Sequence, residues 1–408
     1  MFSKEKVIRF FDKFLYWMVI AIPFAGSFSS ALINIFIGWS ITAYFFKKVL
    51  LKKWPKENPI TIPFLFLFVI SVISMFNSAD LVSSTQGLFK LIKYGFLFLI
   101  ITESVVDVNH VIKIIISITC GLFLTSIDAI YQLVFGKDFL RNHVYDFVIG
   151  LPRLKAAFPH TNLFALYIGL MLPLCICLGF YFFRGKRKLF FTIVSILSVY
   201  CLFFTFSRGA IIGFLVAIII IAISQKDKRL LAIITIVIVS IPFLLPSSIK
   251  DWVKGRSSVW EVLFNAERIY IYKTAVNMIK HHPFIGVGVN TFSQNYLNYK
   301  INQTYGNTGE SKYYGHNNFL HMAGEIGLIG LGIFLWLLFI LFRKWYIIYK
   351  LLPGGSFLKI CSLGIISCII GFLINGLTET GLYNSKVATL FWFQVGLLLA
   401  VLKVAEVY

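Results

Sequence analysis

Long apolar runs recur along the whole chain and alternate with short polar or basic connections. A run of about 17 to 25 apolar residues is long enough to cross a bilayer core of roughly 30 Å as an α-helix. The run from Phe14 to Phe46 exceeds one span, and Pro23 with the small residues after it predicts a turn inside it. The pattern therefore predicts an all-α, polytopic integral membrane protein with about twelve transmembrane helices. Their expected ranges are 14–28, 29–46, 60–77, 87–102, 111–133, 162–183, 189–206, 209–224, 230–245, 318–342, 358–377 and 386–402.

The composition supports this fold class. Apolar residues make up 58% of the chain and charged residues only 13%, which is outside the range of soluble globular domains. A formal charge of +21 is also typical of nucleic-acid binding, but the basic residues fall in alternate connections of the twelve-helix model. The positive-inside rule assigns those connections to the cytoplasm. We expect a multi-pass protein whose partner is the lipid bilayer, with both termini cytoplasmic, a retained N-terminal anchor and no nucleic-acid partner.

The connection at 246–317 is far longer than the few residues usual between helices. Connections of this kind often carry function. We expect three parts: helices one to nine over 1–245, a loop subdomain over 246–317, and helices ten to twelve over 318–408. Within the loop, residues 265–280 have the apolar periodicity of an amphipathic helix. GVGVN, from Gly286 to Asn290, lacks the context of a nucleotide phosphate loop.

Cations are frequent on the side of the membrane that the positive-inside rule should deplete. Each of them alone is more typical of a snorkelling or solvated charge. Together they predict an anionic ligand on that face, since a guanidinium suits phosphate. They come from separate segments: Lys90 and Lys93 three apart on one helix, Arg153, Arg208 in TFSRGA, and Arg268.

Polar residues gather in GHNNFLHMAGEIG, from Gly315 to Gly327, where the long connection meets the tenth helix. His316 is a candidate general base because its ordinary pKa leaves the neutral form available. The alternative is a hydrogen-bonded interfacial histidine without chemistry. Glu325 lies one helical turn after His321, so the two share a face. The spacing does not suit zinc, and the six cysteines lie in apolar runs, so we expect neither a metal site nor disulfides.

Four segments together resemble the O-antigen ligase and polymerase superfamily of bacterial membrane glycosyltransferases. They are RLKAAFPHTNLFALYIGLMLPL, TFSRGAIIGFLVA, ERIYIYKTAVNMIKHHPFIGVGVN and GHNNFLHMAGEIGLIGL, and their order and spacing agree over most of the chain. The resemblance implies about twelve helices with a large periplasmic loop between helices nine and ten. It also implies transfer of a glycan from undecaprenyl diphosphate to an acceptor hydroxyl at the periplasmic face of the inner membrane.

The resemblance also implies residue roles. His316 would be the catalytic base, and Arg208 and Arg268 would bind the diphosphate, with Lys90, Lys93 and Arg153 in reserve. Asn317 and Asn290 would position the acceptor or the loop, and His321 and Glu325 would support the site. Because cations suffice for a diphosphate leaving group, we expect a metal-independent enzyme without a cofactor.

Two alternatives stay open at the level of sequence. The compact histidine motif and the length favour a ligase that uses lipid A core over a polymerase that joins lipid-linked repeat units. A protein-glycosylating branch is disfavoured because the chain ends soon after the last predicted span. A transporter of the same lipid-linked glycan would be expected to carry charges at the bilayer midplane, whereas most charges here lie at the membrane edges.

Overall fold

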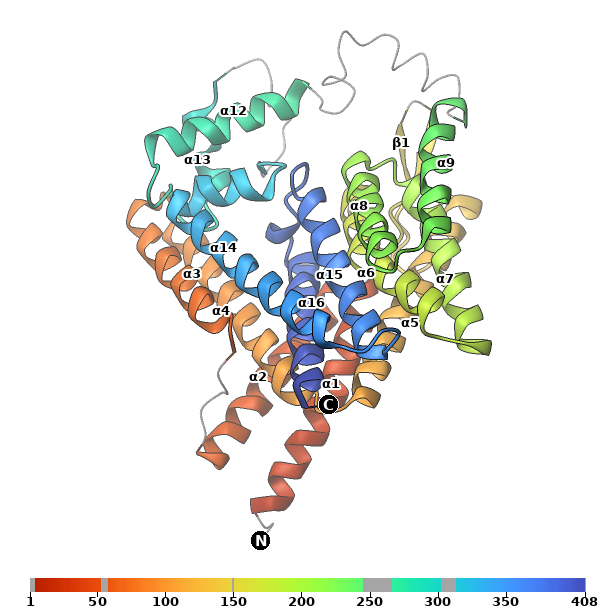
Figure 1. Cartoon of the computed structure of the whole chain (residues 1–408). Coiled ribbons are helices and arrows are strands. Elements are labelled where there is room, and N and C mark those ends of the chain that lie inside the picture. The colour runs from red at the N-terminus through yellow and green to blue at the C-terminus, as the bar shows by residue number, and fades with distance from the viewer. Residues whose placement is uncertain (1–3, 53–57, 149, 245–265, 302–312, 408) are drawn as a thin grey trace.

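The structure is a bundle of α-helices with one short hairpin (Figure 1). It is a computed structural model that describes residues 4–52, 58–148, 150–244, 266–301 and 313–407. These residues form fourteen α-helices. They are α1 (Lys4–Phe28), α2 (Ser30–Leu51), α3 (Thr61–Ser74), α4 (Leu81–Ser104), α5 (Val108–Phe135), α6 (Thr161–Tyr181), α7 (Gly185–Phe204), α8 (Arg208–Ser224), α9 (Lys228–Leu244), α12 (Ala266–His281), α13 (Phe292–Tyr299), α14 (Asn318–Leu351), α15 (Phe357–Asn375) and α16 (Ser385–Val407). Two 3-10 turns, η1 (Met75–Asn77) and η2 (Gly381–Tyr383), and two strands, β1 (Asp146–Val148) and β2 (Leu151–Arg153), complete them.

Every predicted span coincides with one helix, from α1 to α9 and from α14 to α16. Seven of the described helices are long and apolar enough to cross a membrane, and α3 and α8 are shorter apolar helices. The prediction of an all-α, multi-pass membrane protein is thereby confirmed, while the count of twelve crossings stays a prediction. The division into three parts also stays a prediction, because 245–265 and 302–312 of the expected loop lie outside the described residues.

The predicted turn inside the first apolar run lies at Ser29. α1 continues five residues beyond Pro23, so the proline sits within the helix and does not end it. Ser29 has extended backbone, with φ of −134° and ψ of 117°, and its side chain accepts a hydrogen bond from Leu32 N at 3.2 Å. A serine in this position satisfies one of the free N–H groups at the start of α2.

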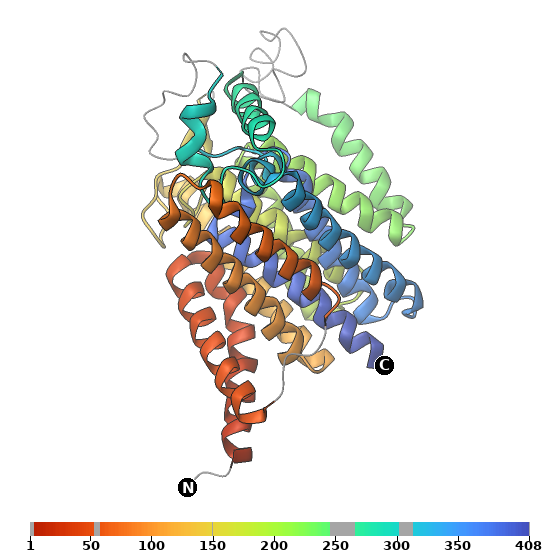
Figure 2. The same cartoon turned by 90° about the vertical axis from the view of Figure 1, so that its left-hand side faces the viewer.

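Three helices form the centre of the bundle. The apolar windows of α6, α15 and α16 are 89%, 83% and 94% buried inside the protein. A helix that is apolar all round is buried on all sides, which these three are. α15 packs against α6 and α8, and α16 packs against α4 (Figure 1). α12 and α13 lie across one end of the bundle, opposite the side where α1 begins and α16 ends (Figure 2); we call this the α12 end.

The connection before α6 contains structure that the sequence did not predict. β1 and β2 form an antiparallel hairpin in which Asp146 pairs with Arg153 and Val148 with Leu151. Three-residue strands show too little alternation to be recognised by period. The hairpin fixes the backbone of Arg153 in front of α6.

α14 is broken near its start, although the sequence predicted an unbroken helix over 318–342. Ile326 has φ of −121° and ψ of 16°, and Gly327 has φ of 73° and ψ of 177°. The second conformation is essentially restricted to glycine. Gly327 therefore has a backbone role, in addition to the packing role that its spacing suggested.

The break leaves backbone groups of α14 without helical partners, and the loop between α12 and α13 pairs with them. The hydrogen bonds are Val287 N to Gly324 O (2.9 Å), Gly288 N to Glu325 O (2.9 Å) and Leu328 N to Pro283 O (2.8 Å). Irregular backbone that is buried requires such partners. The break in α14 and the loop from Pro283 to Gly288 are therefore one structural unit.

We expect Gly327→Ala to lower the free energy of unfolding by about 1–3 kcal/mol, because alanine is strained in this conformation. An added Cβ would also lie 2.0 Å from Phe284 O. The control is Gly332→Ala in the same helix, where a Cβ meets nothing within 4 Å. Removing a mid-helix glycine there should stabilise slightly, by about 0.5–1 kcal/mol. Thermal unfolding in detergent measures the stability of both variants. Equal unfolding midpoints would contradict the backbone role of Gly327.

Candidate active site

Glu379 is the centre of a polar cluster at the α12 end. Its side chain is only 9% exposed and lies in the connection from α15 to α16. The carboxylate Oε1 accepts hydrogen bonds from Arg268 Nη2 at 2.5 Å and from Asn162 Nδ2 at 2.6 Å. On the other oxygen, Oε2, His316 Nδ1 is 3.4 Å away. Four segments far apart in sequence meet at this group, which we call the Glu379 cluster.

The Glu379 carboxyl is held in its ionised form. Burial raises its pKa, but the hydrogen bond with His316 and the positive charge of Arg268 outweigh burial, and the net pKa is lowered. A carboxylate accepts hydrogen bonds and donates none, so the proton of a neutral His316 ring belongs on Nδ1. The lone pair is then on Nε2. His316 is 32% exposed, which leaves its ring accessible.

The backbone around His316 is fixed from both sides. His316 has a φ of 42°, and its carbonyl accepts a hydrogen bond from Tyr272 Oη at 3.0 Å. Asn317 is the N-cap of α14, and its side-chain oxygen accepts from Phe319 N and Leu320 N. The amide nitrogen of Asn317 donates to Leu377 O at 3.0 Å. Asn317 therefore ties the start of α14 to the connection that carries Glu379.

Arg153, the last residue of β2, lies beside this cluster. Arg153 Nη2 donates to Asn162 Oδ1 at 3.2 Å, and its Nε donates to Thr205 O at 2.9 Å. Burial chiefly lowers the pKa of Arg153, and the nearby Arg268 charge acts in the same direction, against Asp146 and Glu379. The structure thus brings Arg153, Arg268 and His316 around one carboxylate.

Arg208 is the first residue of α8, and α8 begins against the same connection. A Cβ on the next residue, Gly209, would lie 1.9 Å from Thr378 Oγ1. Only glycine permits this approach, and Thr378 directly precedes Glu379. The SRG sequence therefore places the start of α8, and with it Arg208, next to the Glu379 cluster.

The contacts of the two predicted lysines lie on other elements. Lys90 Nζ donates to Asn290 Oδ1 at 2.9 Å. Lys93 Nζ donates to Asn34 Oδ1 and to Ser385 Oγ, both at 3.2 Å. Asn290 also donates to Ser83 O at 2.8 Å, so it joins α4 to the loop before α13.

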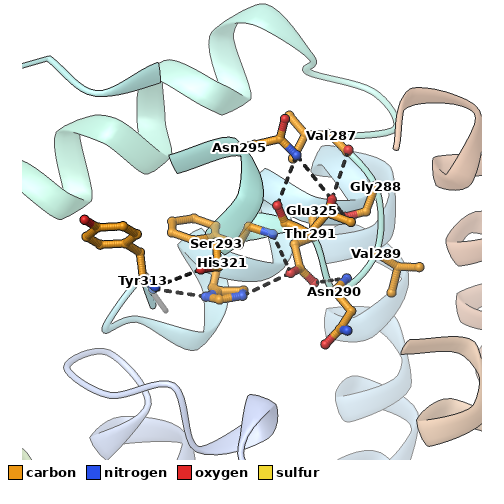
Figure 3. A network of polar contacts seen from close by, with 12 residues as sticks. Val287, Gly288, Val289, Asn290, Thr291, Ser293, Asn295, Tyr313, His321 and Glu325 are labelled. Atoms are coloured by element: carbon orange, nitrogen blue, oxygen red, sulfur yellow. Dashed lines mark hydrogen bonds and ion pairs between the residues drawn. The ribbon is translucent and has the colours of Figure 1, made fainter. Parts of the chain in front are cut away.

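A second buried carboxylate organises the loops next to His316 (Figure 3). Glu325 accepts from Asn290 N at 2.8 Å and from Phe292 N at 3.0 Å, and His321 Nε2 lies 3.2 Å from its Oε1. His321 Nδ1 accepts from Gly315 N at 3.0 Å. This chain of contacts joins the start of α13 to the residue before His316.

The sequence reasoning missed Glu379 and Asn162. Glu379 is an acid in a short connection predicted to lie on the same side as Arg208 and His316, and that position was the available signal. Asn162 ends the FPHTN segment that the resemblance includes, but nothing in the sequence says what it bonds. Among the residues that the structure describes, no three His, Cys, Asp or Glu side chains gather as metal ligands.

Fold and site together define a multi-pass membrane protein with a histidine, a carboxylate and arginines clustered at one end of its bundle. Residues 193–335 match a family model described as O-Antigen ligase, which confirms the resemblance to that superfamily. This range includes Arg208, Arg268 and His316. The match indicates a membrane glycosyltransferase of the ligase or polymerase type.

Comparison with curated proteins gives no match. Among solved structures, one titled "Structural coordination of polymerization and crosslinking by a peptidoglycan synthase complex" aligns with 15% identity and a TM-score of 0.48. The alignment covers 86% of this chain and 98% of that chain. This likeness is too distant to carry an argument about the fold or the reaction.

Glu379 should make the stability of the protein sensitive to acid. Because its pKa is lowered in the folded state from an ordinary value of 4.5, its contribution is present above that value and is lost as the pH falls further. We expect Glu379→Gln to cost about 2 kcal/mol at neutral pH, since charged hydrogen bonds are lost. The difference from wild type should shrink below about pH 4.

Thermal unfolding of both proteins over a pH series measures this effect. Glu267→Gln is the matched control, because Glu267 is a neighbouring carboxylate on α12 that is partly exposed. If the difference in stability between wild type and Glu379→Gln does not change with pH, Glu379 is not an ionised group that stabilises the fold.

Proposed function

We propose that the protein transfers a glycan from undecaprenyl diphosphate to a sugar hydroxyl of an acceptor. The reaction would take place at the periplasmic face of a bacterial inner membrane, with both termini in the cytoplasm. The observation that carries the proposal is the contact of His316 with the buried, ionised Glu379, in a cluster that also holds Arg268. The family match over 193–335 supports the class of reaction.

His316 acts as the general base in this proposal. Its Nε2 takes the proton of the acceptor hydroxyl as that oxygen attacks the anomeric carbon of the donor. The new bond joins the acceptor oxygen to the anomeric carbon. The bond from that carbon to the diphosphate oxygen breaks, and its electron pair leaves with undecaprenyl diphosphate. Glu379 keeps the ring in the required tautomer and stabilises the imidazolium that forms.

The arginines neutralise the leaving diphosphate. Arg268 uses one N–H group on Glu379, and a guanidinium has five, so further donors remain for phosphate oxygens. Arg208 and Arg153 supply charge from α8 and the hairpin. These fixed cations take the part that a divalent metal plays elsewhere, so we propose a reaction without metal or cofactor.

Asn317 and Asn290 position the loops, and His321 and Glu325 support these loops. Asn317 caps α14 next to His316, and Asn290 joins the loop before α13 to α4. His321 and Glu325 hold the residue before His316 through Gly315 N. We propose that all four maintain the position of the base without touching the reacting atoms.

His316→Gln should reduce transfer by about 10²–10⁴, because the base is lost while a side chain of similar polarity remains. Purified protein with lipid-linked glycan and acceptor is assayed for the covalent product. The unfolding temperature should stay close to wild type. His281→Gln is the control, since His281 is an exposed histidine at the end of α12. Near-normal turnover of His316→Gln would reject the role of base.

Reconstitution with two acceptors decides between ligase and polymerase. We expect product with lipid A core, as the sequence favours, and the same yield in the presence of EDTA. Product only with a second lipid-linked repeat unit would make the protein a polymerase. If neither acceptor gives product and the glycan lipid is instead moved across proteoliposomes, the transporter alternative holds and the enzyme proposal is wrong.

A further inference from the structure

A second group of cations surrounds the turn between α1 and α2. Lys386 Nζ donates to Ser27 O, and Arg141 Nη2 donates to the adjacent carbonyl, Phe28 O, each at 3.2 Å. Lys93 reaches the first residues of α2 through Asn34 Oδ1. Lys93, Arg141 and Lys386 come from α4, the connection before α6, and α16, and we call them the turn cluster.

Two contacts show that members of the turn cluster are close to one another. Lys93 Nζ donates to Ser385 Oγ at 3.2 Å, and Ser385 directly precedes Lys386. Lys386 and Arg141 bind neighbouring carbonyl groups of one turn. Three positive side chains therefore lie close together. They are far apart in the sequence, so no helical spacing predicts the cluster.

Among the described residues, no carboxylate forms a side-chain ion pair with a member of the turn cluster; the nearest acid along the chain, the buried Asp138, accepts a hydrogen bond from the backbone N–H of Arg141 at 2.6 Å. The ion pairs formed by the described residues include neither of its lysines nor Arg141. Lys386 is only 5% exposed, and its Nζ lies 3.6 Å from the centroid of the Phe158 ring. A buried cation without a counter-ion is costly, and neighbouring like charges raise that cost.

At the other end of α1, α2 and α4, lysines are neutralised by carboxylates. Lys47 and Lys48 of α2 lie 2.6 Å from Asp12 and Glu103, respectively. Carboxylates therefore pair with lysines where α2 faces α1 and α4 at the opposite side of the bundle. At the turn cluster, the donors face neutral oxygens, which solvate a cation but do not cancel its charge.

We propose that the turn cluster is a phosphate-binding site for the acceptor, separate from the Glu379 cluster that receives the donor diphosphate. The lysine amines are point charges and the Arg141 guanidinium is a planar fork, and both bind phosphate oxygens. The assignment to the acceptor rests on the proposed function. It separates Lys93 from the arginines with which the sequence had grouped it.

The Glu379 cluster and the turn cluster are close enough along the chain for one acceptor molecule to contact both. Glu379 and Lys386 are seven residues apart, since 386 − 379 = 7, so even fully extended they are at most about 25 Å apart. η2 lies between them and shortens the separation. A lipid-linked saccharide held by its phosphate at the turn cluster can therefore present a sugar hydroxyl to His316.

Native mass spectrometry of the purified full chain with undecaprenyl monophosphate tests the site. We expect wild type to bind two probe molecules. Lys93→Gln and Lys386→Met should each weaken one of them by at least about tenfold, and Arg268→Gln should weaken the other. Lys113→Gln, an exposed lysine that contacts Tyr16, is the control and should change neither. Unchanged binding in the Lys93→Gln, Lys386→Met double variant overturns the proposal.

Competition with phosphatidylglycerol distinguishes the source of the phosphate. If phosphatidylglycerol removes the second probe molecule at equal concentration, the site holds a membrane-lipid headgroup and the acceptor assignment is wrong. If it does not, the site discriminates against a membrane-lipid headgroup, and the assignment to the acceptor phosphate stands. Unfolding temperatures and Lys386→Arg, which keeps the charge and should keep binding, separate a lost site from a misfolded protein.

Kinetics then separate this proposal from the proposed function. In the transfer assay, Lys93→Gln should raise the KM for the acceptor about tenfold with kcat near that of wild type. A lower kcat with unchanged KM overturns the assignment to acceptor binding. If wild type shows no turnover at all, the transferase proposal fails, whereas the binding counts still decide whether the turn cluster holds phosphate.

Discussion

An ionised carboxylate in a buried position has to be surrounded by hydrogen-bond donors and cations, and Glu379 imposes this requirement on the α12 end. Burial disfavours its charge, and Arg268, Asn162 and His316 compensate. These partners come from α12, α6 and the residue before the α14 cap. Because they converge on one group, the loops and helices that carry them are fixed relative to one another, and the ring of His316 acquires a defined orientation.

A second constraint comes from the backbone of α14. The break at Ile326 and Gly327 frees buried peptide groups, and the loop from Pro283 to Gly288 pairs with neighbouring backbone groups. Glu325 adds side-chain contacts to the backbone of Asn290 and Phe292. The two carboxylates thus have different tasks. Glu325 accepts hydrogen bonds from backbone N–H groups and orders loops, whereas Glu379 binds Arg268 and orients the ring of His316.

The cations of the α12 end divide into two groups by their partners. Arg153 and Arg268 belong to the network of Glu379, so their charge is partly balanced before any substrate binds. Lys93 and Lys386 face neutral groups. In the proposed transfer, the first group would neutralise the donor diphosphate beside His316. The second group would hold the acceptor phosphate at a separate place.

The sequence by itself determined the fold class and the positions of the helices, because apolar runs and basic connections lie within short segments. Its resemblance to a known family implied the class of reaction. It also named His316, Arg208 and Arg268. Tertiary structure alone decided that Glu379 and Asn162 complete this site, that α14 breaks at Gly327, and that Lys93 stands with Lys386 and Arg141. The physical reason is that a buried charge or a freed peptide group is satisfied by whatever lies nearest in space, and those partners are up to hundreds of residues apart along the chain.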